Sequence, residues 1–206
     1  MIRNIIFDIG NVLVDFCWRD HIRSCGYTGE TAGRLGAAMM QSAAWREMDR
    51  GVWPEEEVLA AFIRNDPALE KEIRRVYENL GTLIREYPGT RRWIRELKDR
   101  GYRVFYLSNF PAKVERDAGD KMSFLAEMDG GILSHRVKKI KPDSGIYLLL
   151  LEQYGLKAEE SVFLDDSPAN VETARKLGMQ GIAVRDQAQA EEELKRLLEE
   201  IGRAHV

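Results

Sequence analysis

The sequence has little of what disulfide-bonded, zinc-binding or membrane-spanning proteins need. Its 206 residues include two cysteines, Cys17 and Cys25, without a CxxC pattern or a histidine cluster beside them. This arrangement disfavours a structural zinc site and favours reduced thiols that pack in the interior. Asp8 interrupts the first apolar run, which is too short for a signal peptide or a membrane-spanning helix. We therefore expect a cytoplasmic protein with no membrane partner.

Neither sign of charge dominates. The chain has 31 Lys and Arg residues against 34 Asp and Glu residues, a formal net charge of -3, and no basic stripe. Nucleic acids attract proteins with clustered positive charge, so a nucleic-acid partner is not expected. With 44% apolar residues the chain is long enough to bury a core, as one domain or as one domain with an insertion.

The spacing of apolar residues changes twice along the chain. Residues 2–7 form a β-branched run typical of a buried strand, whereas residues 18–85 show a three- and four-residue spacing that predicts helices without strands. Strand-like and helical segments then alternate, which favours a parallel sheet with helices on both faces. The first strand must join this sheet, because a lone strand cannot bury itself among helices. The sequence thus predicts an α/β fold: a Rossmann-like core from residues 1–15 and 86–206, and a small all-helical insertion from residues 16–85.

Four local predictions can be checked directly. Residues 39–48 and 69–84 are each expected to be helical throughout, and residues 131–137 are expected to include a short strand. Pro142 is expected to hold the preceding residue extended and to open a helix.

Polar side chains gather at one edge of the predicted sheet. In an open parallel sheet, ligands bind at the carboxyl ends of the strands. Three strands are followed there by polar residues: Asp8 after the first strand, Ser108 and Asn109 after residues 103–107, and Asp165 and Asp166 after residues 161–164. Lys141 precedes a predicted helix at the same edge.

The carboxylates in this group indicate a metal site. Asp165 and Asp166 repel each other unless a cation or a proton lies between them. With Asp8 converging on them, Mg²⁺ is the expected occupant, because it takes oxygen ligands and keeps waters and substrate phosphate. The backbone carbonyl of Gly10 offers a further ligand that needs no side chain.

The remaining groups suit a phosphate. Ser108 offers a hydroxyl, followed by backbone N–H groups at a helix start, and Lys141 offers a positive charge that could hold both a phosphate and an attacking carboxylate. Each motif alone has a structural explanation, as a strand end, a solvated lysine or a helix start. Their joint occurrence at one sheet edge favours a functional site.

Four motifs carry a resemblance to a known family. FDIGNV at residues 7–12, LSN at 107–109, KP at 141–142 and FLDDSPAN at 163–170 resemble, in order, the motifs of the haloacid dehalogenase superfamily of phosphatases. The resemblance covers the whole chain and implies that the insertion is a helical, C1-type cap. Among these enzymes the motifs are most similar to those of bacterial phosphatases of α-D-glucose 1-phosphate.

The resemblance also implies roles for single residues. It implies that Asp8 is a nucleophile that forms an aspartyl-phosphate, with Lys141 as the second catalytic residue. Mg²⁺ would be bound by Asp8, Gly10 and Asp166 with Asp165 in support, and the phosphoryl group by Ser108, Asn109 and Lys141. The function so implied is Mg²⁺-dependent hydrolysis of a small phosphometabolite, such as a sugar phosphate, by a monomer or weak homodimer.

Gly10 departs from the pattern of many relatives, which carry there an aspartate that protonates the leaving group. A general acid contributes about 10² to 10⁴ in rate, or roughly 3 to 5 kcal/mol of barrier. We hypothesise that the leaving group departs easily, as from an anomeric carbon or an acyl phosphate. Asp15, an acid from the cap and the substrate itself are alternative proton donors. Possible substrate contacts in the cap, each equally consistent with packing or a surface charge, are Trp18, Arg19, Arg46, Asp49 and Arg50.

Three functions of other classes remain open. A metal-independent 2-haloacid dehalogenase would use the same nucleophile, although the adjacent carboxylates favour a cation. A response-regulator receiver also gathers acids around Mg²⁺, but its acidic pair comes early in the chain and its phosphoacceptor in the middle. The third is a non-catalytic phosphate-binding module that has lost its acid. The histidines His21, His135 and His205 are given no role in any of these functions.

Overall fold

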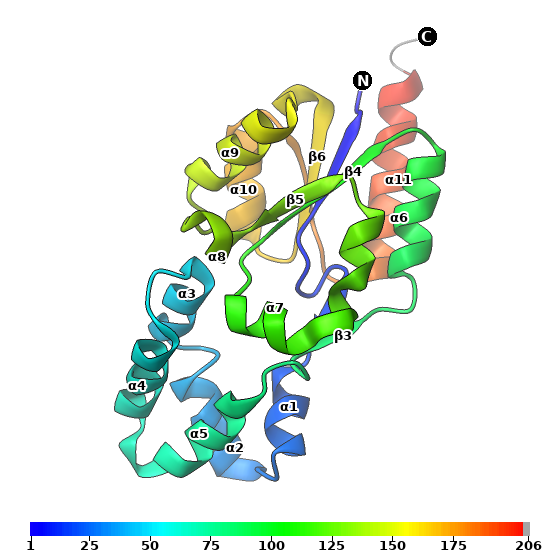
Figure 1. The fold of residues 1–206 in the computed structure, drawn as a ribbon. Coiled ribbons are helices and arrows are strands. Elements are labelled where there is room, and N and C mark those ends of the chain that lie inside the picture. The colour runs from blue at the N-terminus through cyan, green and yellow to red at the C-terminus, as the bar shows by residue number, and fades with distance from the viewer. Residues whose placement is uncertain (204–206) are drawn as a thin grey trace.

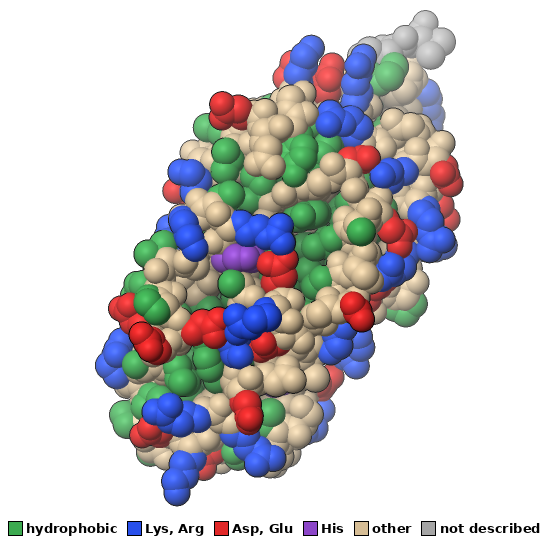
Figure 2. All heavy atoms as spheres, viewed as in Figure 1, with side chains coloured by type: hydrophobic (Ala, Val, Ile, Leu, Met, Phe, Trp, Pro, Cys, Tyr) green, Lys and Arg blue, Asp and Glu red, His purple; other side chains and the backbone are tan. Residues whose placement is uncertain are grey.

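The computed structural model describes residues 1–203, and His205 lies outside the described residues. Figure 1 shows two bodies stacked end to end: a sheet flanked by helices, and beneath it a group of helices drawn in blue and cyan. On the face shown in Figure 2, basic and acidic side chains are interspersed, as the near-balanced composition predicts. No helix in the described part of the chain has the length and apolar character needed to cross a bilayer.

The core sheet has five parallel strands, and the first strand of the chain lies at its centre. The order is β5 (Gly130–Leu133), β4 (Arg103–Ser108), β1 (Asn4–Phe7), β6 (Ser161–Asp165) and β7 (Gln180–Ala183). β1 is buried along its whole length, between β4 and β6. The prediction that the first strand joins the later ones is confirmed, and so is the α/β fold class.

Helices cover both faces of this sheet. They are α6 (Thr90–Asp99) and α11 (Gln187–Arg203) on one face, and α9 (Ser144–Tyr154) and α10 (Pro168–Lys176) on the other. Successive residues of a strand point to opposite faces, so Ile5 and Phe7 lie in one apolar cluster and Ile6 in the other. Phe7 packs edge-on against Trp93 of α6, with ring centroids 4.7 Å apart. This two-sided burial holds the carboxyl ends of the strands in fixed register.

A second sheet of two strands joins the ends of the helical segment. β2 (Val14–Phe16) and β3 (Ile84–Glu86) run antiparallel, with Phe16 opposite Ile84. Between them lie α1 (Trp18–Ser24), α2 (Gly29–Ala38), α3 (Ala43–Arg50), α4 (Glu55–Asn65), η1 (Pro67–Leu69) and α5 (Glu70–Glu78). The prediction of a helix over residues 69–84 is wrong beyond Glu78, because Asn79 takes an extended conformation and the chain continues into β3.

The other elements are α7 (Ala112–Ala118), η2 (Gly119–Glu127), α8 (Ser134–Val137) and η3 (Ala158–Glu160). The helix expected over residues 39–48 is interrupted, because α2 ends at Ala38 and Ser42 caps α3 by accepting a hydrogen bond from the Trp45 N–H. The strand expected in residues 131–137 ends at Leu133, where α8 begins.

Pro142 does not open a helix. α9 begins two residues later, at Ser144, and the Asp143 side chain caps it by accepting a hydrogen bond from the Gly145 N–H at 2.8 Å. The side-chain carboxylate of Asp143 can accept a hydrogen bond from a backbone N–H in the first turn, whereas a proline side chain cannot. The helix therefore begins after Asp143.

Candidate active site

Three carboxylates meet at the carboxyl end of the sheet. Asp8 follows β1, Asp165 ends β6, and Asp166 comes next in the chain. One oxygen from each of the three lies within 4.8 Å of the others. Burial raises the pKa of Asp165 to about 6 and also raises the pKa of Asp166. Oxygen donors at this spacing fit a small divalent cation, which would relieve their mutual repulsion.

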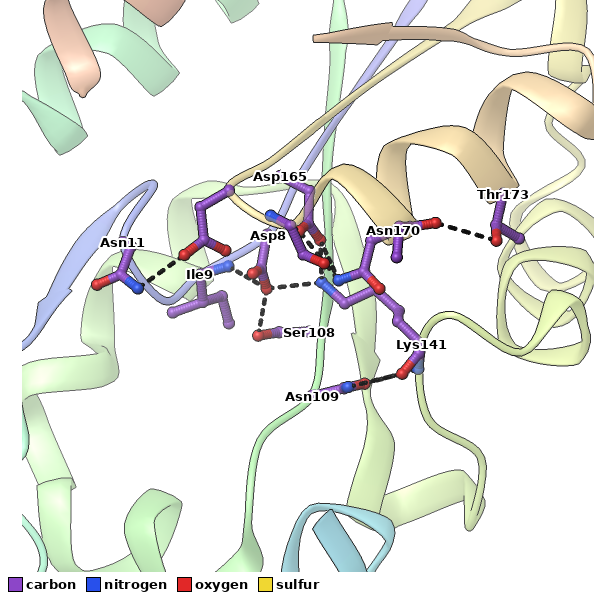
Figure 3. A network of polar contacts seen from close by, with 12 residues as sticks. Asp8, Ile9, Asn11, Ser108, Asn109, Lys141, Asp165, Asn170 and Thr173 are labelled. Atoms are coloured by element: carbon purple, nitrogen blue, oxygen red, sulfur yellow. Dashed lines mark hydrogen bonds and ion pairs between the residues drawn. The ribbon is translucent and has the colours of Figure 1, made fainter. Parts of the chain in front are cut away.

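Lys141 lies between two of these carboxylates (Figure 3). Its Nζ is 2.9 Å from Asp8 Oδ1 and 2.5 Å from Asp165 Oδ2, and the residue is only 2% exposed. Burial alone would lower the pKa of Lys141, but the charges of Asp165 and Asp8 outweigh burial and raise it. The lysine is therefore held charged in the interior by two ion pairs.

Asp8 is oriented by donors that all bind one of its oxygens. Oδ1 accepts hydrogen bonds from the Ile9 N–H at 2.8 Å and the Ser108 hydroxyl at 2.6 Å, in addition to its ion pair with Lys141. Within residues 1–203 the other oxygen, Oδ2, makes no hydrogen bond or ion pair. Asp8 is nevertheless 8% exposed, so the carboxylate is fixed but can be reached.

Asn109 holds the backbone of Lys141. Its Oδ1 accepts from the Lys141 N–H at 2.8 Å, and its Nδ2 donates to the Lys141 carbonyl at 3.0 Å. These two bonds tie the end of β4 to the segment before α9. Asn109 thus positions the lysine as well as lining the cavity described below.

Two asparagines complete the site, and the sequence analysis gave neither a role. Asn11, with a left-handed φ of 57°, donates its side-chain amide to Asp166 Oδ2 at 2.8 Å. Asn170, in the first turn of α10, donates to Asp165 Oδ1 at 3.0 Å. Both belong to motifs that the sequence analysis quotes, but only Asn170 lies near its carboxylate partner along the chain, five residues after Asp165. The partner of Asn11 is 155 residues away, so a local signal was available for Asn170 alone.

A cavity of about 180 Å³ opens beside Asp8. Its core side is formed by Asp8, Gly10, Asn11, Ser108, Asn109 and Asp166, and its other walls by Phe16, Trp45, Asp49, Ile84, Phe110, Pro111 and Val114. A larger hollow of about 710 Å³ lies between α6 and α11 and is lined by none of the predicted site residues.

The residues of the helical segment that were considered as substrate contacts differ in whether they line the cavity. Asp49 lines the cavity, whereas Trp18, Arg19, Arg46 and Arg50 do not. Asp15 does not line it either, because its carboxylate accepts a hydrogen bond at 2.7 Å from Arg85 on the neighbouring strand.

The family of this protein follows from a sequence match that spans most of the chain. A model of the haloacid dehalogenase-like hydrolases matches residues 2–178, which is most of the chain. The chain belongs to this family. It is therefore a haloacid dehalogenase-like hydrolase, and the cluster at the strand ends is its candidate catalytic site.

Known proteins similar to this chain include two phosphatases and one enzyme of the same fold. This hydrolase is 26% identical over 194 residues to the sesquiterpene phosphatase astK of Aspergillus oryzae, covering 94% of this chain and 95% of that protein. It is 27% identical over 136 residues to a phosphorylated carbohydrates phosphatase of Thermotoga maritima, covering 63% of each. A family enzyme from Bacteroides thetaiotaomicron, solved with magnesium and inorganic phosphate, has a TM-score of 0.70 at 18% identity and covers 90% of this chain and 95% of that one.

Proposed function

We propose that this protein is a Mg²⁺-dependent phosphatase that hydrolyses a small phosphometabolite through an aspartyl-phosphate on Asp8. The observation that carries the proposal is the arrangement of Asp8, which is held by Ser108 and Lys141 through one oxygen and lines a cavity. A carboxylate fixed in this way is a preorganised nucleophile. The phosphatase relatives and the magnesium- and phosphate-bound structural neighbour support the same chemistry.

In this proposal one residue acts as the nucleophile and the other groups stabilise the phosphate. Asp8 Oδ2 attacks phosphorus, while Lys141 and the Ser108 hydroxyl stabilise negative charge on the phosphoryl oxygens. Asp8, the Gly10 carbonyl and Asp166 would hold Mg²⁺, with Asp165 in support. When bound, the ion neutralises phosphate charge so that an anionic carboxylate can approach.

The helical segment between the two strands of the small sheet serves, in this proposal, as a cap over the core. Residues 16–85 contribute Phe16, Trp45, Asp49 and Ile84 to the cavity wall, and residues 1–15 and 86–206 contribute the rest. A cap seated on the strand ends excludes water from the acyl-phosphate and selects the leaving group.

A sugar phosphate such as glucose 1-phosphate is the first candidate substrate. The cavity of about 180 Å³ offers room for a phosphate with a small leaving group. Trp45 contributes an aromatic side chain to the cavity lining, and one relative acts on phosphorylated carbohydrates. The motif similarity to glucose 1-phosphate phosphatases supports the same class.

A phosphate ester of a small apolar alcohol is the second candidate. Apolar side chains make up most of the wall opposite Asp8: Phe16, Trp45, Ile84, Phe110 and Val114. Sugar hydroxyls would find few hydrogen-bond partners there, and an unpaired buried hydroxyl is costly. The similarity to the sesquiterpene phosphatase of Aspergillus oryzae supports this candidate.

Phosphate release from p-nitrophenyl phosphate, glucose 1-phosphate and dimethylallyl phosphate tests the proposal. Activity should require Mg²⁺, disappear with chelator and be lost in Asp8→Asn, whose amide keeps the shape of the carboxylate. Chelator-resistant activity on a 2-haloacid without phosphate release would identify a dehalogenase instead. Phosphate binding without turnover of any ester would identify a non-catalytic module.

A further inference from the structure

The glycine two residues past the nucleophile leaves an open position in the site. A Cβ built on Gly10 meets nothing within 4 Å, so no close contact requires glycine here. The leaving group of a phosphate ester still needs a proton unless it is a stable anion. Another acid that reaches the same cavity could supply it.

Asp49 is the acid that the cap places in this cavity. It lies in the last turn of α3, two residues before Gly51, which ends the helix in a left-handed conformation. The residue is 8% exposed, and within residues 1–203 its carboxyl group makes no hydrogen bond or ion pair. No fully buried side-chain nitrogen or oxygen in residues 1–203 lacks a hydrogen-bond partner, so the carboxyl oxygens of Asp49 remain accessible from the cavity that this residue lines.

The backbone around Asp49 is fixed to the core and not only to the cap. The Ser134 hydroxyl, at the start of α8, donates to the Asp49 carbonyl at 2.5 Å, and Lys138 Nζ donates to the Gly51 carbonyl. A Cβ on Gly51 would come within 2.8 Å of the His135 side chain, so the glycine allows this close approach. Figure 1 shows the end of α3 beside α8.

The charges around Asp49 favour its protonated form. Burial, and then the nearby Asp8, raise the pKa of Asp49 to about 8, against the weaker opposing effects of Lys141 and Arg46. His135 of α8 faces the same junction but is bound through Nδ1 to the Phe110 carbonyl and paired through Nε2 with Glu115. Near neutral pH the carboxyl therefore carries a proton that it can donate.

We propose that Asp49 is the general acid of this hydrolase and supplies the proton that Gly10 cannot. The proposal rests on the phosphatase function proposed above. As Asp8 Oδ2 forms its bond to phosphorus, the ester P–O bond breaks, its electron pair moves to the leaving oxygen, and the Asp49 proton converts that oxygen to the alcohol. The resulting Asp49 carboxylate then takes a proton from the water that attacks the aspartyl-phosphate, which releases phosphate and restores both aspartates.

The test compares leaving groups in Asp49→Asn, which keeps the side-chain shape but cannot donate a carboxylic proton. For kcat/KM, which reports the first step, we expect a loss of about 10² to 10⁴ with glycerol 2-phosphate. We expect less than about tenfold loss with p-nitrophenyl phosphate, whose leaving group departs as an anion. In the wild type, kcat/KM for glycerol 2-phosphate should fall at alkaline pH, and this limb should be absent in the variant.

The matched control is Asp15→Asn, which removes a carboxylate at the edge of the cap that does not line the cavity. It should leave the ratio of the two kcat/KM values unchanged. An equal loss on both substrates in Asp49→Asn, or no loss on either, overturns the assignment and leaves the phosphatase proposal standing. A wild type that releases no more phosphate than Asp8→Asn overturns both.

Discussion

The two sides of the active-site cavity are built differently. On the core side every charged group is held by partners: Asp8 by three donors, Lys141 by two carboxylates, and Asp165 by Lys141 and Asn170. On the cap side, within residues 16–85, Asp49 is the one carboxyl that lines the cavity, and it lies among apolar side chains without a hydrogen bond or ion pair. In the proposed reaction, a rigid network whose charges are all paired suits the step that every substrate would share, the transfer of phosphate to Asp8. A cap-side wall with few polar groups suits the leaving group, which is the part that differs from one substrate to another.

Replacing the nucleophile is the strongest test of the core side. Asp8→Asn should lower kcat by at least about 10⁴-fold, because no other group can form the aspartyl-phosphate. Circular dichroism should stay near that of the wild type, since the amide still accepts from Ser108 and Ile9 and Lys141 keeps its ion pair with Asp165. Residual turnover within tenfold of the wild type would show that the nucleophile lies elsewhere.

Replacing Lys141, the positively charged side chain between Asp8 and Asp165, should lower the stability of the fold as well as the activity. Lys141→Met leaves Asp8 and Asp165 buried beside each other without their shared partner. Breaking a buried pair from one side costs about 3 to 5 kcal/mol of unfolding free energy. Urea denaturation without Mg²⁺ measures this loss, and added Mg²⁺ should restore part of it. A loss below about 1 kcal/mol would mean that the network is not the stabilising feature described here.

The two sides also differ in how far the sequence predicts them. The core side follows from topology, because residues after parallel strands must meet at one edge, and so Asp8, Ser108 and Asp165 could be placed together from their strands alone. Asn11 and Asn170 were missed because their roles depend on side-chain direction within a turn. No comparable rule predicts from the sequence which residues of the cap reach the cavity.

The cap side depends on contacts that no local pattern encodes. Asp49 was one of five candidates from the helical segment, and only the seating of α3 on α8 separates it from its neighbours. The strand β3 was missed for a similar reason, since its partner β2 lies about 70 residues earlier and its apolar residues also fit a helix. Pairing between distant segments decides both outcomes.

The raised pKa of Asp49 predicts a pH dependence of stability on the cap side. The folded state keeps Asp49 protonated up to a pKa of about 8, whereas the unfolded chain ionises it above about pH 4. The contribution of Asp49 is therefore lost as pH rises between these values, because the unfolded state binds fewer protons. Relative to Asp49→Asn, the wild type should lose about 2 kcal/mol of unfolding free energy between pH 6 and pH 8 in metal-free urea denaturation. Parallel pH profiles for the two proteins would contradict the burial of an acidic group at this position.

Loosening the contact between cap and core should have a smaller effect. Ser134→Ala leaves the Asp49 carbonyl without its donor and the Phe110 N–H without its acceptor. We expect a loss of about 1 to 2 kcal/mol in unfolding free energy. We also expect kcat/KM to fall more for glycerol 2-phosphate than for p-nitrophenyl phosphate, since Asp49 is less well positioned. Equal falls would assign Ser134 to folding alone.

The smallest effect is expected for the other aspartate near the cavity. Asp15 pairs with Arg85 across the small sheet, and the two side chains are 34% and 62% exposed. Such ion pairs contribute about 0.2 to 1 kcal/mol and weaken with salt. Asp15→Asn should therefore change the unfolding free energy by less than about 1 kcal/mol, and less again at high salt. Because both aspartates belong to the junction of cap and core, a large catalytic effect at Asp15 would mean that the charge of this junction, and not a proton delivered from α3, controls turnover.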